Sequence, residues 1–336
     1  MSGAYLGTLE QNDPLYGFML RDIMPKAESE VRDPVFHVSR LPGSNMVFKY
    51  HEERTRKKFI GKFYRNFEPA KEIRLRGEFD NLNRARALGL TRLPNYVVRP
   101  FGRDRDIGLG LMEEYVEGKD LDHYIRRAVH EGRDKRLKQR LTELASFLAV
   151  LHKKTATGKF LDLAPSLKYF GKVLDKLKRK GAVDESQCRE FLALETRWRE
   201  RDFMRRDEEV VIHGDATPTN FLFPKEKGVI AIDLERMRDG DRMFDVGMVC
   251  GELKHAFIWR TGNKYQAEEY IGHFLDEYSR KFKNSGKFYC SMVRRNPFYM
   301  ALTELRIARN SWLDRGHRAM LVKEAKECLR WGLRIK

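Results

Sequence analysis

The chain has few cysteines and no long apolar run. Its four cysteines, Cys188, Cys250, Cys290 and Cys328, are scattered over 336 residues and form no Cys-x-x-Cys pair. Such a set predicts reduced thiols and argues against a zinc site. No stretch approaches the ~20 apolar residues of a membrane-spanning helix. The N-terminal stretch lacks a basic segment followed by an apolar core, so we expect neither a secretory signal nor a transmembrane segment, and a cytoplasmic location.

Acidic residues are scarce relative to basic ones. Asp and Glu number 49 against 66 Lys and Arg, which gives a formal net charge of +17. This excess favours an anionic partner, such as a nucleotide or a phosphorylated or acidic molecule. The basic residues cluster at 54–58, 176–180, 197–206 and 294–295. Several clusters also contain acidic residues, as solvated helix faces do, and no RNA-recognition, KH or zinc-finger signature accompanies them, which argues against nucleic acid.

The segment 210–247 holds the densest set of candidate catalytic residues. Its first apolar run, 210–212, predicts a buried strand, and the polar loop that follows carries Asp215 and Asn220 five positions apart. After a turn-like stretch, a second apolar run ends on Asp233. A strand, a loop and a hairpin in this order would bring the three side chains to the same end of a small sheet.

These residue types suit phosphoryl transfer. Asn220 and Asp233 offer the hard oxygen donors that Mg²⁺ prefers. Asp215 can accept the proton of an attacking hydroxyl. The alternative is a loop in which the Asp and the Asn only cap turns. The spacing of these residues and the strands on either side favour the catalytic interpretation.

The same segment resembles the active site of a known superfamily. An Asp-x4-Asn order followed by a strand-ending Asp is similar to the kinase catalytic loop and its metal-binding Asp. His-Gly-Asp at 213–215 and Ile-Asp-Leu-Glu at 232–235 depart from protein kinases and resemble the aminoglycoside phosphotransferase and choline kinase superfamily. The resemblance implies that His213 orients the loop, that Glu235 supports the metal or reaches the acceptor, and that Asp245 is a structural brace for the loop backbone.

The first third of the chain predicts an antiparallel sheet. Alternating and apolar runs bounded by turn residues indicate five strands. They are expected at 35–38, 46–50, 58–64, 97–100 and 108–112. Residues 1–30 carry no regular pattern and are expected to form an irregular extension.

Within this sheet, Lys62 in Ile-Gly-Lys-Phe resembles the strand lysine that pairs the α- and β-phosphates of the nucleotide. A helical pattern that stops at Gly89 follows, and Glu78 begins its apolar face. In kinases a Glu on this helix holds the lysine by an ion pair. Glu72 is an alternative partner, and Lys49 is an alternative lysine. The plain interpretation, that Lys62 and Glu78 are surface charges, also stays open.

Two further nucleotide contacts follow from the resemblance. A turn containing Gly43 and Ser44 would lie over the phosphates and donate backbone N–H groups, although it holds one glycine and no GxGxxG. Met-Glu-Glu-Tyr-Val-Glu-Gly at 112–118 resembles the hinge between kinase lobes. The carbonyl of Glu114 and the N–H of Val116 are expected to bind the adenine edge, with a shift of one residue left open.

The remainder of the chain predicts helices. A leucine repeat over 137–151 indicates a long amphipathic helix, and His152 at its end is expected to be structural. The long interval from there to the catalytic loop holds two more helical patterns, near 166–179 and 184–200. Such an insert resembles aminoglycoside phosphotransferases more than protein kinases. Some polar residues of the C-terminal helices could line the acceptor pocket: Glu252, His255, Glu304, Arg306, Arg309 and Asn310.

The sequence therefore predicts an α+β, protein-kinase-like bilobal fold, with a nucleotide-binding N-lobe at 1–116 and a mostly helical C-lobe at 117–336. The expected activity is ATP- and Mg²⁺-dependent phosphorylation of a hydroxyl on a small molecule, which the net charge suggests to be a sugar or an acidic or phosphorylated metabolite. An atypical protein kinase and a non-catalytic nucleotide- or nucleic-acid-binding scaffold are the alternatives. Oligomeric state and the choice between ATP and GTP stay open.

Overall fold

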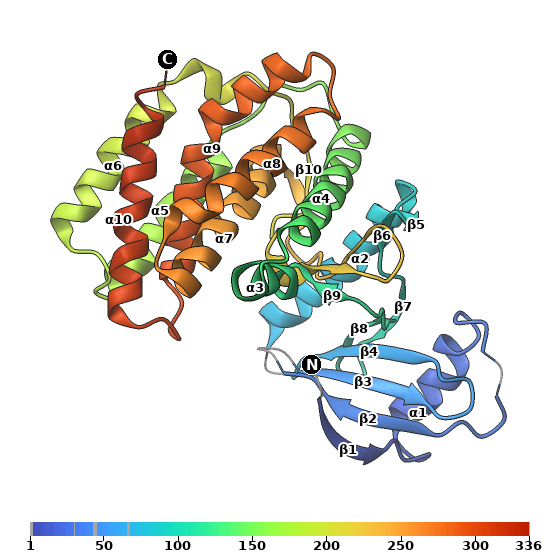
Figure 1. The fold of residues 1–336 in the computed structure, drawn as a ribbon. Helices are drawn as coiled ribbons and strands as arrows, with labels where there is room; N and C mark the ends of the chain where they lie inside the picture. The colour runs from blue at the N-terminus through green and yellow to red at the C-terminus, as the bar shows by residue number, and fades with distance from the viewer. Residues whose placement is uncertain (1–2, 30, 43–45, 66–67, 336) are drawn as a thin grey trace. The chain divides into compact units, whose positions relative to one another are not determined.

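The chain divides into two units, each with its own secondary structure. The computed structural model describes residues 3–29, 31–42, 46–65 and 68–335 (Figure 1). The first unit comprises Met1–Gly118 and Ile230–Arg236, and the second comprises Lys119–Val229 and Met237–Lys336. An antiparallel sheet dominates the first unit and helices dominate the second. The predicted α+β class is confirmed.

Six strands form the sheet of the first unit, in the order β1-β2-β3-β4-β8-β7, with antiparallel neighbours. They are β1 (Ala4–Thr8), β2 (Phe36–Arg40), β3 (Met46–Glu52), β4 (Lys58–Phe63), β7 (Pro100–Asp104) and β8 (Leu109–Glu114). Lys62 of β4 lies opposite Val47 of β3 and Leu111 of β8. Lys62 is therefore carried by an interior strand that is hydrogen-bonded on both sides.

The N-terminal segment is regular, which differs from the irregular extension expected for residues 1–30. Strand β1 adds a sixth strand at the edge of the sheet, and helix α1 (Pro14–Phe18) runs directly into a π-helical turn, η1 (Met19–Ile23). The apolar side chains of α1 and η1 join the core that contains Phe36 of β2. A helix of five residues is too short to show a periodic apolar pattern, and a π-turn does not follow the 3.6-residue period.

One long helix, α2 (Pro69–Ala87), packs on the sheet, and Glu78 lies on its buried face. Its end agrees with the stop predicted at Gly89. Helix and sheet approach closely because Gly110 of β8 has no side chain: a Cβ there would lie 2.5 Å from that of Leu75. Two short strands, β5 (Thr91–Arg92) and β6 (Asn95–Val97), follow α2.

The segment Ile230–Arg236 belongs to the first unit through backbone contacts. It includes most of strand β12 (Val229–Ala231). The N–H of Val98 donates to the carbonyl of Ala231 (3.3 Å), and Nδ2 of Asn81 donates to the carbonyl of Leu234 (2.8 Å). These bonds fix the chain on both sides of Asp233.

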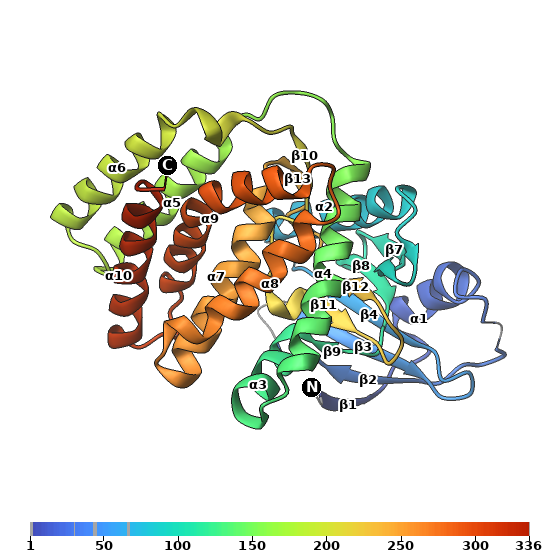
Figure 2. The ribbon, with the colours of Figure 1, turned by 45° about the horizontal axis from the view of Figure 1, so that its top comes forward.

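Helices build most of the second unit (Figures 1 and 2). The α-helices are α3 (Leu121–Glu131), α4 (Asp134–Lys154), α5 (Ala164–Arg179), α6 (Glu185–Arg199), α7 (Arg242–Thr261), α8 (Glu268–Ser279), α9 (Ser285–Ala308) and α10 (Arg315–Gly332). Short 3₁₀ turns are η2 (Asp202–Arg205), η3 (Pro218–Asn220) and η4 (Lys264–Ala267), and short strands are β9 (Lys119–Asp120), β10 (Val210–Ile212), β11 (Phe221–Phe223) and β13 (Arg238–Gly240). The helices predicted over 137–151, 166–179 and 184–200 are confirmed.

The local sequence explains these elements with one exception. The leucines of α4 are almost fully buried, as their helical spacing predicts, and α6 starts with a capping box between Asp184 and Gln187. The exception is β13, which pairs with β10 so that Ile212 lies opposite Arg238. The charged Arg-Asp-Gly of β13 gives no apolar alternation from which a strand could be predicted. Within the described residues, no helix is both long and apolar enough to cross a membrane.

Candidate active site

Lys62 is the centre of a buried ion-pair cluster in the first unit. Its Nζ lies 2.5 Å from Oε1 of Glu78 and 3.1 Å from Oε1 of Glu113. Burial alone would lower the pKa of Lys62, but the carboxylates of Glu113, Glu78 and Asp233 raise it above its ordinary value. Lys62 therefore stays an ammonium ion, the form that can bind phosphate oxygens.

The structure shows which lysine and which glutamate form the buried ion pair. Glu72 pairs with Arg105 instead, at 3.3 Å from its Nε, and Nζ of Lys49 lies over the ring of Tyr115 at 5.8 Å from the centroid. Neither alternative residue shares the buried position of the Lys62–Glu78 pair.

Glu113 is a member of this cluster that the sequence interpretation missed. Leu111 lies directly opposite Lys62, and Glu113 is two residues further along β8, so both point to the same face as Lys62. The alternation Leu109, Leu111, Glu113 was the available signal. Burial raises the pKa of Glu113, and the ammonium of Lys62 opposes that shift.

Asp233 stands at a bend of the backbone in the same unit. Its φ of 59° lies in the left-handed region, which few residues other than glycine adopt, although Asp tolerates it. Such positions are concentrated at functional sites, where the chain must turn to present a side chain. Glu235, two positions on, is largely buried, and its Oε1 lies 3.3 Å from Nε of Arg236.

Asp245 holds the backbone of the His-Gly-Asp loop in the second unit. Its Oδ2 accepts the N–H of His213 (2.7 Å), and its Oδ1 accepts the N–H of Gly214 (2.9 Å). Burial opposes its ionisation, but hydrogen bonds from His152 and Gly214 keep the pKa of Asp245 below its ordinary value. A charged acceptor at the start of α7 thereby fixes the two residues that precede Asp215.

His152 has the structural position expected of it. It is fully buried; its Nε2 lies 3.2 Å from Oδ2 of Asp245 and its Nδ1 lies 2.6 Å from the hydroxyl of Tyr278. Burial lowers the pKa of His152. His213, in contrast, packs its ring against Phe221, with 5.1 Å between centroids.

Asp215 and Asn220 are joined within the loop. Nδ2 of Asn220 donates to the backbone carbonyl of Asp215 (2.9 Å), and the turn η3, which starts at Pro218, brings the two residues together. Because the amide nitrogen is used as this donor, Oδ1 of Asn220 is directed to the other side. Asn220 of the second unit thus presents a hard oxygen, a donor type that Mg²⁺ prefers, and the carboxylate of Asp233 in the first unit is of the same donor type.

Arg306 of α9 contacts Asp215 directly. Its Nη2 donates to Oδ1 of Asp215, and its Nη1 donates to Oε1 of Glu252 on α7 (3.0 Å). Arg306 and Glu252, two of the candidates for the acceptor pocket, therefore lie beside the proposed catalytic residue. No sequence motif marks them, because their pairing depends on how α7 and α9 pack.

The expected nucleotide contacts in the hinge and the phosphate turn stay predictions. The side chain of Glu114 accepts the N–H of Arg99 (2.6 Å) and the hydroxyl of Tyr96. These bonds brace the end of β8, whereas the predicted adenine contacts use the backbone of Glu114 and Val116. The turn with Gly43 and Ser44 lies outside the described residues.

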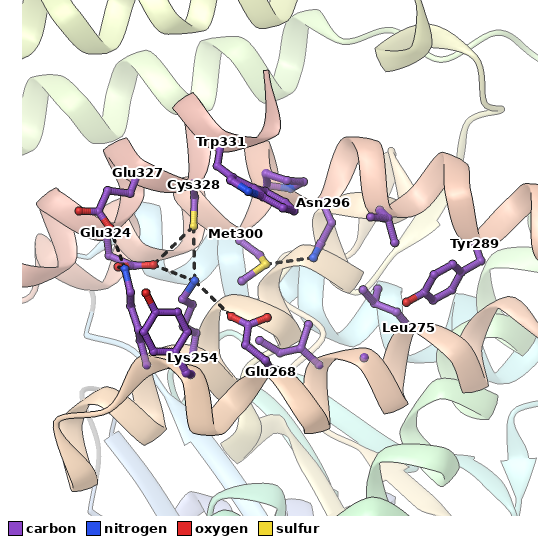
Figure 3. Close-up of a pocket in the computed structure, with 16 residues that line it drawn as sticks. Lys254, Glu268, Leu275, Tyr289, Asn296, Met300, Glu324, Glu327, Cys328 and Trp331 are labelled. Carbon is purple, nitrogen blue, oxygen red and sulfur yellow. Dashed lines mark hydrogen bonds and ion pairs between the residues drawn. The ribbon is translucent and has the colours of Figure 1, made fainter. Parts of the chain in front are cut away.

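A separate cavity of about 590 Å³ lies among helices α7 to α10 (Figure 3). Nζ of Lys254 lies 2.7 Å from Oε1 of Glu324 and 3.7 Å from Sγ of Cys328. A carboxylate oxygen of Glu304 lies within 4.8 Å of one of Glu324 and of Sγ of Cys328, which places Glu304 beside this cluster. The residues that line the cavity do not include the His-Gly-Asp loop, so we keep it apart from phosphoryl transfer.

A strand lysine paired to a helix glutamate, together with a braced His-Gly-Asp loop, defines a kinase-like small-molecule phosphotransferase. Comparison with protein-family models matches residues 37–281 to the phosphotransferase enzyme family. Because the match spans more than half of the chain, this protein belongs to that family, whose kinases phosphorylate hydroxyl groups of small molecules.

Solved structures show the same fold. A choline kinase from Cryptosporidium parvum matches with a TM-score of 0.62 and 14% identity over 96% of this chain and 97% of that one. A Plasmodium vivax ethanolamine kinase matches with a TM-score of 0.60 and 15% identity over 95% of this chain and 87% of that one. The streptomycin–ATP complex of APH(2″)-IIa matches with a TM-score of 0.55 and 11% identity over 96% of this chain and 97% of that one. A search of curated proteins finds no match. At these identities the likeness concerns the fold.

Proposed function

We propose that this protein transfers the terminal phosphoryl group of ATP to a hydroxyl of a small molecule, with Mg²⁺ as the cofactor. The observation that carries the proposal is the loop in which Asp245 fixes the N–H groups of His213 and Gly214, directly before Asp215. A loop held in this way keeps the carboxylate of Asp215 in one orientation. Such fixed geometry is the main contribution a protein makes to phosphoryl transfer.

Each residue has a separate role in the proposed reaction. Asp215 orients the acceptor hydroxyl and accepts its proton. Asn220 and Asp233, supported by Glu235, hold Mg²⁺, which neutralises phosphate charge when bound. Lys62, held by Glu78 and Glu113, binds the α- and β-phosphates. The backbone of Glu114 and Val116 binds adenine.

The acceptor we propose is a sugar or an acidic or phosphorylated metabolite. The net charge of +17 favours anionic molecules at the surface. The guanidinium of Arg306 is bonded to both Asp215 and Glu252, so it offsets part of their negative charge but leaves no net positive charge beside the acceptor hydroxyl.

Nucleotide binding to the native state raises the melting temperature by mass action, so a thermal-shift titration tests the site. ATP and GTP are titrated with and without Mg²⁺ against wild type, Asp233→Ala and Asp215→Asn. We expect a Mg²⁺-dependent shift that weakens in Asp233→Ala and persists in Asp215→Asn, which in turn loses turnover. Glu226→Ala, an exposed residue of the turn before β12, is the matched control. No shift with either nucleotide, or full turnover in Asp215→Asn, would contradict the proposal.

A further inference from the structure

Four aromatic rings meet where α7 ends and α10 begins, within the second unit. His255 and Trp259 belong to α7, Trp312 precedes α10, and His317 lies in its first turn. The rings of Trp259 and His317 are 4.5 Å apart, those of Trp259 and Trp312 are 5.9 Å apart, and Nδ1 of His255 lies 3.2 Å from Nε2 of His317. We call these four residues the indole–imidazole cluster.

The two indoles of the cluster are exposed. Trp259 is 46% exposed and Trp312 is 63% exposed, although large apolar rings are usually covered. Their edge-to-face packing on each other and on His317 holds them in a fixed orientation. Rigid exposed aromatic rings of this kind mark binding surfaces, because they offer contact area at a small entropic cost.

The cluster is continuous with the proposed catalytic residue. Glu252, His255 and Trp259 follow at steps of three and four, so they share one face of α7. Arg306 joins Glu252 to Asp215. At a rise of 1.5 Å per residue, Glu252 and Trp259 are about 10 Å apart along the helix. A molecule of this length, about that of two linked sugar rings, can contact the cluster with one ring while a hydroxyl of the other lies at Asp215.

The chemistry of the cluster indicates what it binds. Burial, together with His317 and Arg260, lowers the pKa of His255 to about 4, and burial lowers the pKa of His317, so both rings are neutral at physiological pH. Because Nδ1 of His255 and Nε2 of His317 bond to each other, each neutral ring keeps one nitrogen that can exchange a hydrogen bond with a hydroxyl group. Asp314, next to the cluster, uses its Oδ1 to accept the N–H of His317 (2.8 Å), so an ammonium ligand would have to bind through cation–π contacts with the indole faces.

We propose that the indole–imidazole cluster is the acceptor-binding subsite and that the acceptor is a saccharide. The apolar C–H face of a sugar ring lies on the exposed indoles, and ring hydroxyls exchange hydrogen bonds with His255 and His317. This places another hydroxyl of the same molecule toward Asp215. The inference rests on the proposed function, which it narrows to sugar kinases.

Ligand-observed saturation-transfer NMR on Asp215→Asn protein tests the subsite without turnover. The probes are glucose, N-acetylglucosamine and glucuronic acid, with choline as the cationic comparison. The cluster variants are Trp312→Ala and the conservative Trp312→Phe. Trp331→Ala is the control, because Trp331 is similarly exposed (59%) but lines the cavity of Figure 3. Thermal unfolding confirms that each variant is folded.

We expect saturation transfer to at least one saccharide, a loss of about tenfold or more in affinity in Trp312→Ala, near-normal binding in Trp312→Phe, and no change in Trp331→Ala. Binding of choline in preference to every saccharide, the absence of saccharide binding, or equal affinity in Trp312→Ala would overturn the inference. Saccharide binding without phosphoryl transfer by wild type would instead contradict the proposed function, so the two failures are distinct.

Discussion

Arg306 donates a hydrogen bond from Nη2 to Oδ1 of Asp215, although the two residues are 91 positions apart in the sequence. Nη1 of the same guanidinium binds Glu252 (3.0 Å), so one planar cation fixes two largely buried carboxylates. A planar guanidinium with fixed donors restricts the rotation of a carboxylate more strongly than an ammonium does. Arg306 therefore acts as a positioning residue for Asp215.

The first prediction concerns this contact. Arg306→Met is expected to lower kcat by roughly 10- to 100-fold, because a misplaced catalytic group is costly even when it remains chemically intact. The KM for ATP is expected to change little. Arg306→Lys keeps the charge but not the two-donor geometry, so its kcat is expected to lie between those of wild type and Arg306→Met. Steady-state kinetics on the best acceptor provide the measurement, with Arg189→Met, at an exposed position of α6, as the control. An unchanged kcat in Arg306→Met would remove the positioning role.

The second prediction concerns the Lys62 cluster. Lys62→Met leaves the buried carboxylates of Glu78 and Glu113 without their cation, which is expected to lower the free energy of unfolding by ~3–5 kcal/mol. Adding Glu78→Gln removes one of these charges and is expected to restore part of the loss, although ATP binding stays weak. Urea unfolding of the two single variants and the double variant gives the coupling energy. Additive losses would show that Lys62 and Glu78 are not energetically coupled.

The contact of Lys62 with Glu78 and that of Asp245 with the loop backbone were expected because the short motifs around these residues resemble those of the kinase superfamily. The helices α4, α5 and α6 were predictable because their apolar residues repeat at helical spacing. Local patterns of this kind survive without knowledge of tertiary structure.

The remaining features depend on packing between distant segments. The sequence around Arg306 gives no sign of its role, because the packing of α9 on α7 places it at Asp215. The indole–imidazole cluster likewise combines two helices and a loop. Strand β13 forms because β10 offers a partner, although its own residues are charged and polar. Propensity gives no signal where tertiary pairing supplies the stabilisation.

The third prediction concerns the brace of the catalytic loop. Asp245→Asn replaces one of two carboxylate oxygens by an NH₂ group that faces a backbone N–H, so one of the two bonds to His213 and Gly214 is lost. Bonds to charged groups contribute ~1.5–3 kcal/mol each, and we expect a stability loss of about that size with a large fall in kcat. Thermal unfolding measures the loss of stability, and steady-state kinetics measure the fall in kcat. Asp162→Asn, an exposed carboxylate, should change neither. Normal activity in Asp245→Asn would show that the loop does not need its brace.

The fourth prediction concerns stability in mild acid. The pKa of His255 is lowered to about 4 from an ordinary value of 6.5, mainly by burial. As the pH falls below 6.5, the unfolded chain therefore binds a proton that the folded chain does not bind until about pH 4. The unfolded state is favoured progressively through this window, and the free energy of unfolding is expected to fall by roughly 3 kcal/mol from this residue. His152, whose pKa burial also lowers, contributes in the same direction.

Urea unfolding at pH 7.0, 6.0, 5.0 and 4.5 measures this dependence in wild type and in His255→Asn, which cannot take up the proton. The variant is expected to lose less stability between pH 6.5 and 4.5 than wild type does, even if it is less stable at pH 7. His130→Asn, at an exposed position of α3, is the control and should keep the wild-type slope. If His255→Asn keeps that slope as well, His255 is protonated in the folded protein, and the neutral imidazole pair that we assign to saccharide binding is wrong.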